Sequence, residues 1–428
     1  MSWLYRNFRV RDAAPLAVAA ASLALCVFAR PAAAQEINFA PFGSATAEWD
    51  SNRSLARPPQ SAGSYGGVVG ADLRDLSPRS YMDLAAQISY TDIPQLGYDW
   101  TSGNVAFKSD VKTLNADYTL LADYRRDDAF FTEFGQAQFN NGLTLTSPDT
   151  NGTANVTTGI TRESYEVDPG FDYNFTPRLD LEGDFRVNSV RYNIQAPGQR
   201  VDYTSPYAGL TLNYDTSQRS SIGIGPYYSH YQETNGNKLT DVAGGENTTD
   251  TEGVAFSYNY KTSDVTRMSV VLRVERDHIE ALDFSPQSAT GWGLEWVGTH
   301  KFQVGNVQFS IGRFLEPSSI GGRVTMDQFR AQVYRPLSAR LSFTGAVRAT
   351  HTVVVGNALE SVSPPENRAN AEMYLRFDIT RTWYVTGGYI FARSVDLGES
   401  NLAYSNGVLL TVGYQALEPP RPVDFNFK

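Results

Sequence analysis

Cysteine is almost absent from this sequence, because Cys26 is the only one among 428 residues. It lies in an N-terminal segment that we expect to be removed, which excludes structural disulfides and thiolate metal sites from the mature chain. Long apolar runs are equally scarce. The apolar stretch Ala13–Phe28 is shorter than the roughly 20 residues that a spanning helix needs, and it belongs to the same segment. The sequence therefore argues against a helical membrane protein.

That N-terminal segment has the features of a secretory signal peptide. Three arginines precede the apolar stretch, and Ala32-Ala33-Ala34 supplies the small residues that signal peptidase requires. We therefore expect residues 1–34 to be cleaved. A lipoprotein signal at Cys26 is disfavoured because the preceding residue is Leu25 and not a small residue.

Basic residues are outnumbered by acidic ones. The signal peptide carries four of the 36 Lys and Arg residues and one of the 46 Asp and Glu residues, so 32 basic against 45 acidic residues remain, a net charge of −13. An acidic balance of this size argues against a nucleic-acid partner.

Histidine is rare, which limits the catalytic sites the chain could build. Ser229 and His230 are adjacent and so point to opposite faces of a strand, which excludes a local nucleophile–base pair. The chain has no nucleophile elbow, zinc-protease motif or phosphate-binding loop.

The acidic stretches 149–152 and 246–250 lack EF-hand spacing, and we expect solvated loops there, or loops bridged to lipopolysaccharide by divalent cations. We predict no enzyme, no metal site and no cofactor. The remaining histidines are His278, His300 and His351.

What the sequence does contain is a period of two, with charges on one face only. In residues 179–188 the apolar face holds Leu179, Leu181, Gly183, Phe185 and Val187. The opposite face holds Asp180, Glu182, Asp184, Arg186 and Asn188. The alternation returns at residues 114–124, 165–175, 268–274 and 373–379. It predicts an all-β fold, a single antiparallel up-and-down transmembrane β-barrel with its apolar face towards lipid.

Short turns alternate with longer polar stretches such as 235–250 and 355–367. Segregated loop lengths are typical of outer-membrane barrels and not of a secreted β-sandwich. We expect about 18 strands, or 16–20, because residues 127–162 form either one long loop or an extra hairpin. The predicted turns lie at 76–79, 108–111, 176–178, 216–219, 262–265, 300–303, 336–339 and 380–382.

The barrel is expected to occupy residues 35–415, from a first strand at Asn38–Trp49 to a last strand at Tyr404–Tyr414. An even strand count would place both termini in the periplasm. Residues 416–428 would then form a proline-rich periplasmic tail. The aromatic end of the last strand resembles the signal that the barrel-assembly machinery recognises, which makes that machinery an expected partner during biogenesis.

Three short motifs carry a family resemblance. Residues 47–52 (AEWDSN) contain an aromatic-Asp-x-Asn motif, several turns follow a Tyr-x-Thr-Ser-x-Arg type, and Asn406-Gly407-Val408 stands near the end. Together they resemble a family of outer-membrane β-barrel porins often encoded with exopolysaccharide or capsule export genes. The resemblance implies a component of polysaccharide secretion or a related pore, and it transfers no individual functional residue.

Charged rows of a spanning strand must face the lumen, because Arg or Lys on the lipid face would cost about 2–4 kcal/mol at mid-membrane. The candidate lumen-lining residues are Asp180, Glu182, Asp184, Arg186, Arg273, Glu275, Glu372, Arg376 and Asp378. Candidates for stacking on sugar rings are Tyr81, Tyr207 and Tyr374. Two interpretations stay open: a hydrated acidic conduit that disfavours anions, or acids and arginines that pair and fill the interior.

The sequence thus predicts a passive outer-membrane channel, or an export-associated barrel, for saccharide or polysaccharide. The alternative is a structural or surface-interaction barrel with a plugged lumen, and an outer-membrane hydrolase is a third hypothesis. Outer-membrane lipid and lipopolysaccharide are the expected surroundings. The substrate, the direction of transport and the oligomeric state are not encoded in any motif we find.

Overall fold

The computed structural model describes residues 36–52, 55, 59–128, 139–140, 144–145, 160–193, 202–233, 248–281, 284–317, 323–355, 366–396 and 401–416. The predicted signal peptide, the tail beyond residue 416 and most of residues 127–162 lie outside the described residues. Within the described ranges, no helix is both long enough and apolar enough to cross a membrane.

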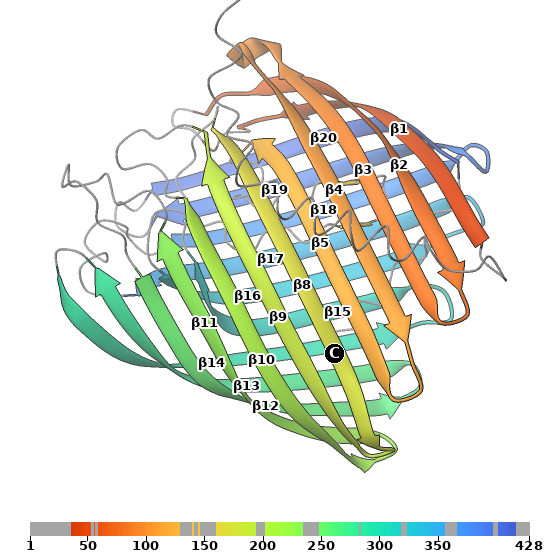
Figure 1. Cartoon of the computed structure of the whole chain (residues 1–428). Helices are drawn as coiled ribbons and strands as arrows, with labels where there is room; N and C mark the ends of the chain where they lie inside the picture. Colours follow the sequence, from red (N-terminus) through yellow and green to blue (C-terminus); the bar gives the residue numbers. More distant parts are fainter. Residues whose placement is uncertain are drawn as a thin grey trace, which may run out of the picture.

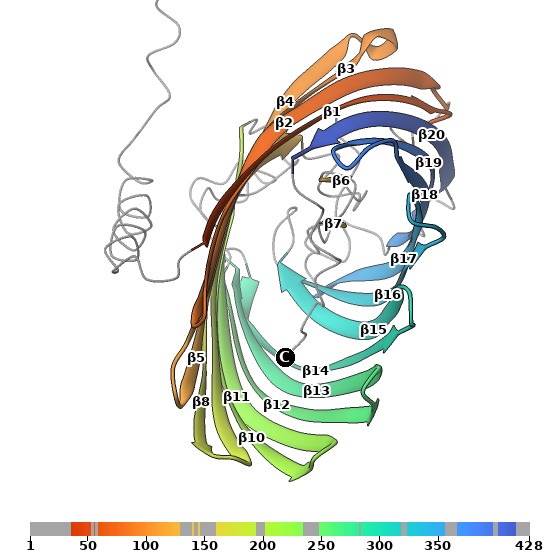
Figure 2. The ribbon, with the colours of Figure 1, turned by 90° about the vertical axis from the view of Figure 1, so that its right-hand side faces the viewer.

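Eighteen strands form one antiparallel sheet in which each strand pairs with its neighbours in chain order. The first strand, β1, also pairs with the last, β20, so the sheet closes into an up-and-down barrel (Figures 1 and 2). The strands are β1 (Glu36–Asp50), β2 (Ala62–Ser77), β3 (Ser80–Ile93), β4 (Tyr98–Lys112), β5 (Ala116–Asp128), β8 (Thr161–Thr176), β9 (Leu179–Tyr192), β10 (Tyr203–Ser217), β11 (Ser220–Glu233), β12 (Thr248–Ser263), β13 (Thr266–Ala281), β14 (Phe284–Lys301), β15 (Asn306–Pro317), β16 (Arg323–Pro336), β17 (Leu341–Val355), β18 (Glu366–Asp378), β19 (Trp383–Asp396) and β20 (Asn401–Gln415).

Two further short strands do not join the barrel. β6 (Phe139–Asn140) and β7 (Thr144–Leu145) pair only with each other. They fall in the region that could have been a long loop or an extra hairpin. Because they add nothing to the barrel sheet, the strand number is 18, as predicted. A short 3₁₀ turn, η1 (Pro94–Leu96), connects β3 to β4.

The outer surface of the barrel is a continuous apolar belt. Ile224, Phe256, Leu272 and Leu294 lie directly opposite one another on β11 to β14, and each is 38–49% exposed. A soluble protein would bury such a row, whereas a bilayer-spanning barrel presents it to lipid. The outward face of the remaining strands follows from the same register, because a residue and its cross-strand partner lie on the same face.

One predicted turn was wrong. Residues 108–111 lie inside β4, and the turn falls at residues 113–115. Lys108 and Asp110 suit a polar turn, but they also suit the polar inward face, where their charged groups lie 3.4 Å apart. At the observed turn the Thr113 hydroxyl donates to the Ala116 carbonyl oxygen, at 2.8 Å. The other predicted turns lie at or within two residues of observed ones.

The seam between β1 and β20 joins two motifs that are far apart in the sequence. The backbone N–H of Ser51 donates to the Asn406 carbonyl oxygen, and the Asn406 N–H donates to the Ser51 hydroxyl, both at 2.9 Å. The buried Asp50 carboxylate accepts from the Asn52 N–H at 2.7 Å and from the Ser405 hydroxyl. The aromatic-Asp-x-Asn motif and Asn406-Gly407-Val408 thus meet where the barrel closes.

Candidate functional site

The inward face of β9 carries four consecutive charged side chains. Asp180, Glu182, Asp184 and Arg186 alternate with the outward Phe185 and its apolar neighbours, so all four point away from the belt. Neighbouring strands add acids to this wall. Asp172 of β8 lies directly opposite Glu182, and Asp117 of β5 lies directly opposite Asp172. Because like charges opposite one another are unfavourable, the wall needs hydrogen-bond donors and counter-charges.

Those donors and cations come from adjacent strands. The Asn213 amide of β10 donates to Asp180 at 2.9 Å and to Glu182 at 3.2 Å. Arg186 lies 3.3 Å from Asp168 of β8. The acidic wall is therefore a bonded network and not a set of isolated charges.

The candidate residues of β13 and β18 are also inward and also bonded. Arg273 lies 3.6 Å from Glu295, and the Tyr227 hydroxyl donates to Glu275 at 2.6 Å. On β18, Arg376 donates to Asp378 at 2.8 Å and covers the Tyr384 ring at 3.8 Å. The Tyr374 hydroxyl donates to Glu372 at 3.1 Å. Paired polar groups therefore line the inward faces of these strands.

Pairing does not fill the whole interior. The side chain of Arg186 is 59% exposed, and the inward Lys108 and Leu121 are each 44% exposed. On the inward face of β10–β12, towards the end that carries the longer connections, Tyr203, Tyr231 and Thr251 are all 0% exposed. The lumen wall is thus open to solvent at some heights and covered at others.

The three tyrosines chosen for sugar stacking have different surroundings. All three face inward, and the Tyr81 hydroxyl donates to Asp83 at 2.7 Å. The Tyr207 ring lies 6.0 Å from that of Tyr227. Tyr374 is only 3% exposed, and its ring lies so close to Gly388 that a Cβ there would approach Tyr374 Cδ1 to 2.6 Å. Packing over a glycine occupies the ring face that a sugar would need.

Sequence reasoning missed a second charged wall. Arg330 of β16 lies directly opposite Arg348 of β17 on the inward face, and Arg368 follows on the inward face of β18. The Gln328 amide oxygen, in the orientation that satisfies both groups, accepts from Arg348 Nε at 3.1 Å and Nη2 at 3.0 Å. Figure 2 shows β16–β18 across the ring from β8 and β9. The alternation in residues 328–332 and 344–348 could have revealed these arginines, but each stretch carries only one inward charge.

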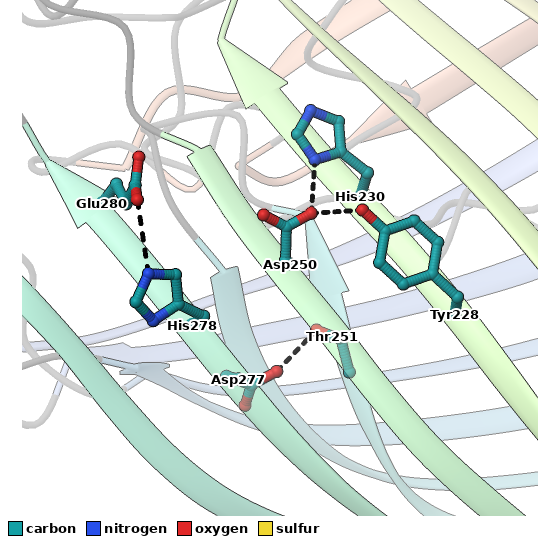
Figure 3. A network of polar contacts seen from close by, with 7 residues as sticks. All are labelled: Tyr228, His230, Asp250, Thr251, Asp277, His278 and Glu280. Carbon is teal, nitrogen blue, oxygen red and sulfur yellow. Dashed lines mark hydrogen bonds and ion pairs between the residues drawn. The ribbon is translucent and has the colours of Figure 1, made fainter.

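The histidines lie on the outward face, which separates them from the lumen. His230 Nδ1 lies 2.8 Å from Asp250, which also accepts from the Tyr228 hydroxyl (Figure 3). His278 lies 3.3 Å from Ser288 through Nδ1 and 3.3 Å from Glu280 through Nε2. A serine, a histidine and an acid are therefore close together.

Their surroundings argue against nucleophilic catalysis. The side chains of His278 and Glu280 are 47% and 60% exposed, so they lack the desolvated site in which a nucleophile and an oxyanion are stabilised. Ser229 faces inward, opposite Thr251 and away from His230, as their adjacency predicted. Within the described residues, no group of three or more His, Cys, Asp or Glu side chains could hold a metal ion.

Comparisons with known proteins yield distant structural likenesses alone. No protein-family model and no curated protein sequence matches the chain. Among solved structures, OccK2 (OpdF) from Pseudomonas aeruginosa in complex with glucuronate is 9% identical, with a TM-score of 0.44 over 89% of this chain and 98% of that one. OccAB3 from Acinetobacter baumannii is also 9% identical, with a TM-score of 0.44 over 89% of this chain and 99% of that one. The FrpB iron transporter from Neisseria meningitidis is 9% identical, with a TM-score of 0.41 over 88% of this chain and 81% of that one. The chain is similar to these three structures over 88–89% of its length, at 9% sequence identity.

Proposed function

We propose that this chain is a passive outer-membrane channel for small hydrophilic solutes. The observation that carries the proposal is that charged inward side chains keep contact with water, with Arg186 at 59% exposure. A lumen filled by its own side chains would bury that guanidinium, because an ion without solvent or complete pairing is costly. The bonded network on β8–β10 then acts as a rigid, hydrated wall and not as a plug.

The apolar belt supports placement in a membrane, and the 18-stranded closed barrel supports the outer membrane of a Gram-negative cell. We propose that the short-turn end and both termini face the periplasm. The motifs at the seam support the finer proposal that the solutes include saccharides and that the barrel serves polysaccharide export. We further propose that the protein is a channel and not an enzyme.

Planar-bilayer recording of the purified protein tests the channel. We expect stepwise ion currents, and liposome swelling with small neutral sugars that falls as the sugars grow. Arg186→Ala, which shortens an exposed lumen side chain, should raise the swelling rate, whereas Val187→Ala on the lipid face of the same strand should not. An absence of current and of swelling in folded protein would refute the proposal.

A second candidate is a barrel whose long-loop end is closed, with a structural or surface role. The complete burial of Tyr203, Tyr231 and Thr251 on the inward face at that end favours it. The same recordings separate the two, because a closed barrel would fold and insert but would conduct no ions.

A further inference from the structure

A basic row lies on the lipid-facing side of β5, β8 and β9, near the long-loop end. Arg126 lies directly opposite Glu163, and Glu163 lies directly opposite Arg191. All three share the outward face with Tyr165 and Val167. Arg126 and Arg191 are exposed, and Arg126 Nε lies 3.7 Å from Glu163 Oε1. One carboxylate between two guanidiniums leaves the row with a net positive charge.

The residues below this row change in polarity towards the middle of the barrel. In the next outward positions the rings of Tyr124 and Tyr165 lie 4.9 Å apart. One step further, Val167 lies directly opposite Val187, which is 48% exposed. Charge, then tyrosine, then aliphatic surface is the order in which a lipid presents its headgroup, its interfacial region and its acyl chains.

The charge balance differs elsewhere on the same outward band. On β12 and β13, Asp250, Glu252 and Glu280 accompany the single Arg276, and part of this group is visible in Figure 3. On β15, Arg313 donates to both carboxylate oxygens of Asp327, at 2.6 and 2.7 Å. Acidic side chains thus outnumber arginine on β12 and β13 and match it on β15 and β16, whereas two arginines flank one glutamate on β5, β8 and β9.

We propose that Arg126 and Arg191 bind a phosphate group of an outer-leaflet glycolipid. Neighbouring strands lie about 4.8 Å apart, so two arginines on strands separated by one other strand can both reach a single phosphate. Arginine binds phosphate through paired N–H donors. The tyrosines contact the sugar, and an acyl chain lies on the valines. This inference rests on the proposed placement of the long-loop end at the outer leaflet.

The test compares the wild-type barrel with Arg126→Gln/Arg191→Gln and with the matched control Arg276→Gln, which removes an exposed outward arginine from an acidic surrounding. Each protein is folded in detergent and incubated with lipid A, with dephosphorylated lipid A or with phosphatidylglycerol. Native mass spectrometry measures the lipid retained. We expect the double variant to bind lipid A about tenfold or more weakly, as lost charge-assisted hydrogen bonds predict, and the control to match wild type.

Three results would overturn the inference: unchanged binding by the double variant, equal retention of dephosphorylated lipid A, or equal retention of phosphatidylglycerol. Heat-modifiable gel mobility checks that each variant is folded. Bilayer recordings on the same preparations keep the two proposals apart. Lipid A binding without current would refute the channel alone, and current without lipid A binding would refute the glycolipid site alone.

Discussion

At the residue scale, the Asp50 carboxylate is a buried polar group whose acceptors are satisfied across the barrel seam. It is 1% exposed, and it accepts from the Asn52 N–H and from the Ser405 hydroxyl, which is 355 residues away in the chain. Gly407 lies beside it, since a Cβ there would come within 3.1 Å of Asp50 Oδ2. A short acidic side chain and a glycine therefore fit together where the first strand meets the last.

We predict that Asp50→Ala destabilises the closed barrel by about 1–3 kcal/mol, the cost of leaving buried donors without their acceptor. Urea titration followed by the folded-band shift on gels would measure this. Asp215→Ala, at an exposed position near a short turn, is the control and should change stability little. Equal stability of the two variants would contradict a structural role for the seam motif.

A second residue-scale prediction concerns the glycines under aromatic rings. Gly388→Ala should destabilise by about 1–3 kcal/mol, because the new Cβ overlaps the Tyr374 ring and forces it to move. Gly387→Ala is the control, since nothing lies within 4 Å of a Cβ there. Combining Gly388→Ala with Tyr374→Ala in a double-mutant cycle should show a coupling energy, and purely additive effects would disprove the packing.

At the element scale, alternation within a strand decides which side chains meet water. Leu120 and Leu121 are neighbours on β5, and both are apolar, so composition cannot assign their faces. Pairing assigns them: Leu121 lies opposite Lys108 and Asp168 on the inward face. The 44% exposure of Leu121 is therefore exposure to the lumen and not to lipid.

Single-cysteine labelling tests this register. The mature chain expected after signal cleavage has no cysteine, so Leu120→Cys and Leu121→Cys each introduce one thiol. In proteoliposomes, a charged maleimide should label Leu121→Cys and spare Leu120→Cys, because the reagent does not enter the hydrocarbon core. The reverse pattern would mean that β5 is shifted by one residue, which exchanges the two faces.

At the scale of the whole molecule, closure of the barrel sets two unlike charged walls across one lumen. The acidic wall of β5, β8 and β9 faces the arginines of β16–β18 across the ring (Figure 2). An acidic lumen alone would favour cations, but the arginine wall opposes that field. The proposed channel should therefore prefer cations only weakly.

Reversal potentials in a salt gradient would measure this balance. Arg330→Gln/Arg348→Gln should increase the cation preference, and Asp180→Asn/Glu182→Gln should decrease it or reverse it, because each pair removes charge of one sign from the lumen wall. Both changes keep the side-chain size nearly constant. Shifts in the same direction for the two variants would contradict a lumen shared by both walls.

Much of the fold and of the inward face could be predicted from the sequence, because alternation and turn residues are local features of each strand. A period of two, charges confined to one face and alternating turn lengths predict a barrel of about 18 strands, and the structure has 18; the register places Asp180, Glu182 and Arg186 on the inward face. The turn at residues 113–115 was missed because Lys108 and Asp110 satisfy a turn and a polar inward face equally well.

The sequence by itself determined that alternating strands form an antiparallel barrel of about 18 strands, since alternation and turn chemistry act over a few residues. Only the tertiary structure decided which strands and which residues meet. It brought Asp50 to Ser405, set Arg348 across the lumen from the acidic wall, and placed Glu163 between Arg126 and Arg191. Those neighbours depend on cross-strand register and on barrel closure, which are fixed by all the strands together and leave no mark within any one of them.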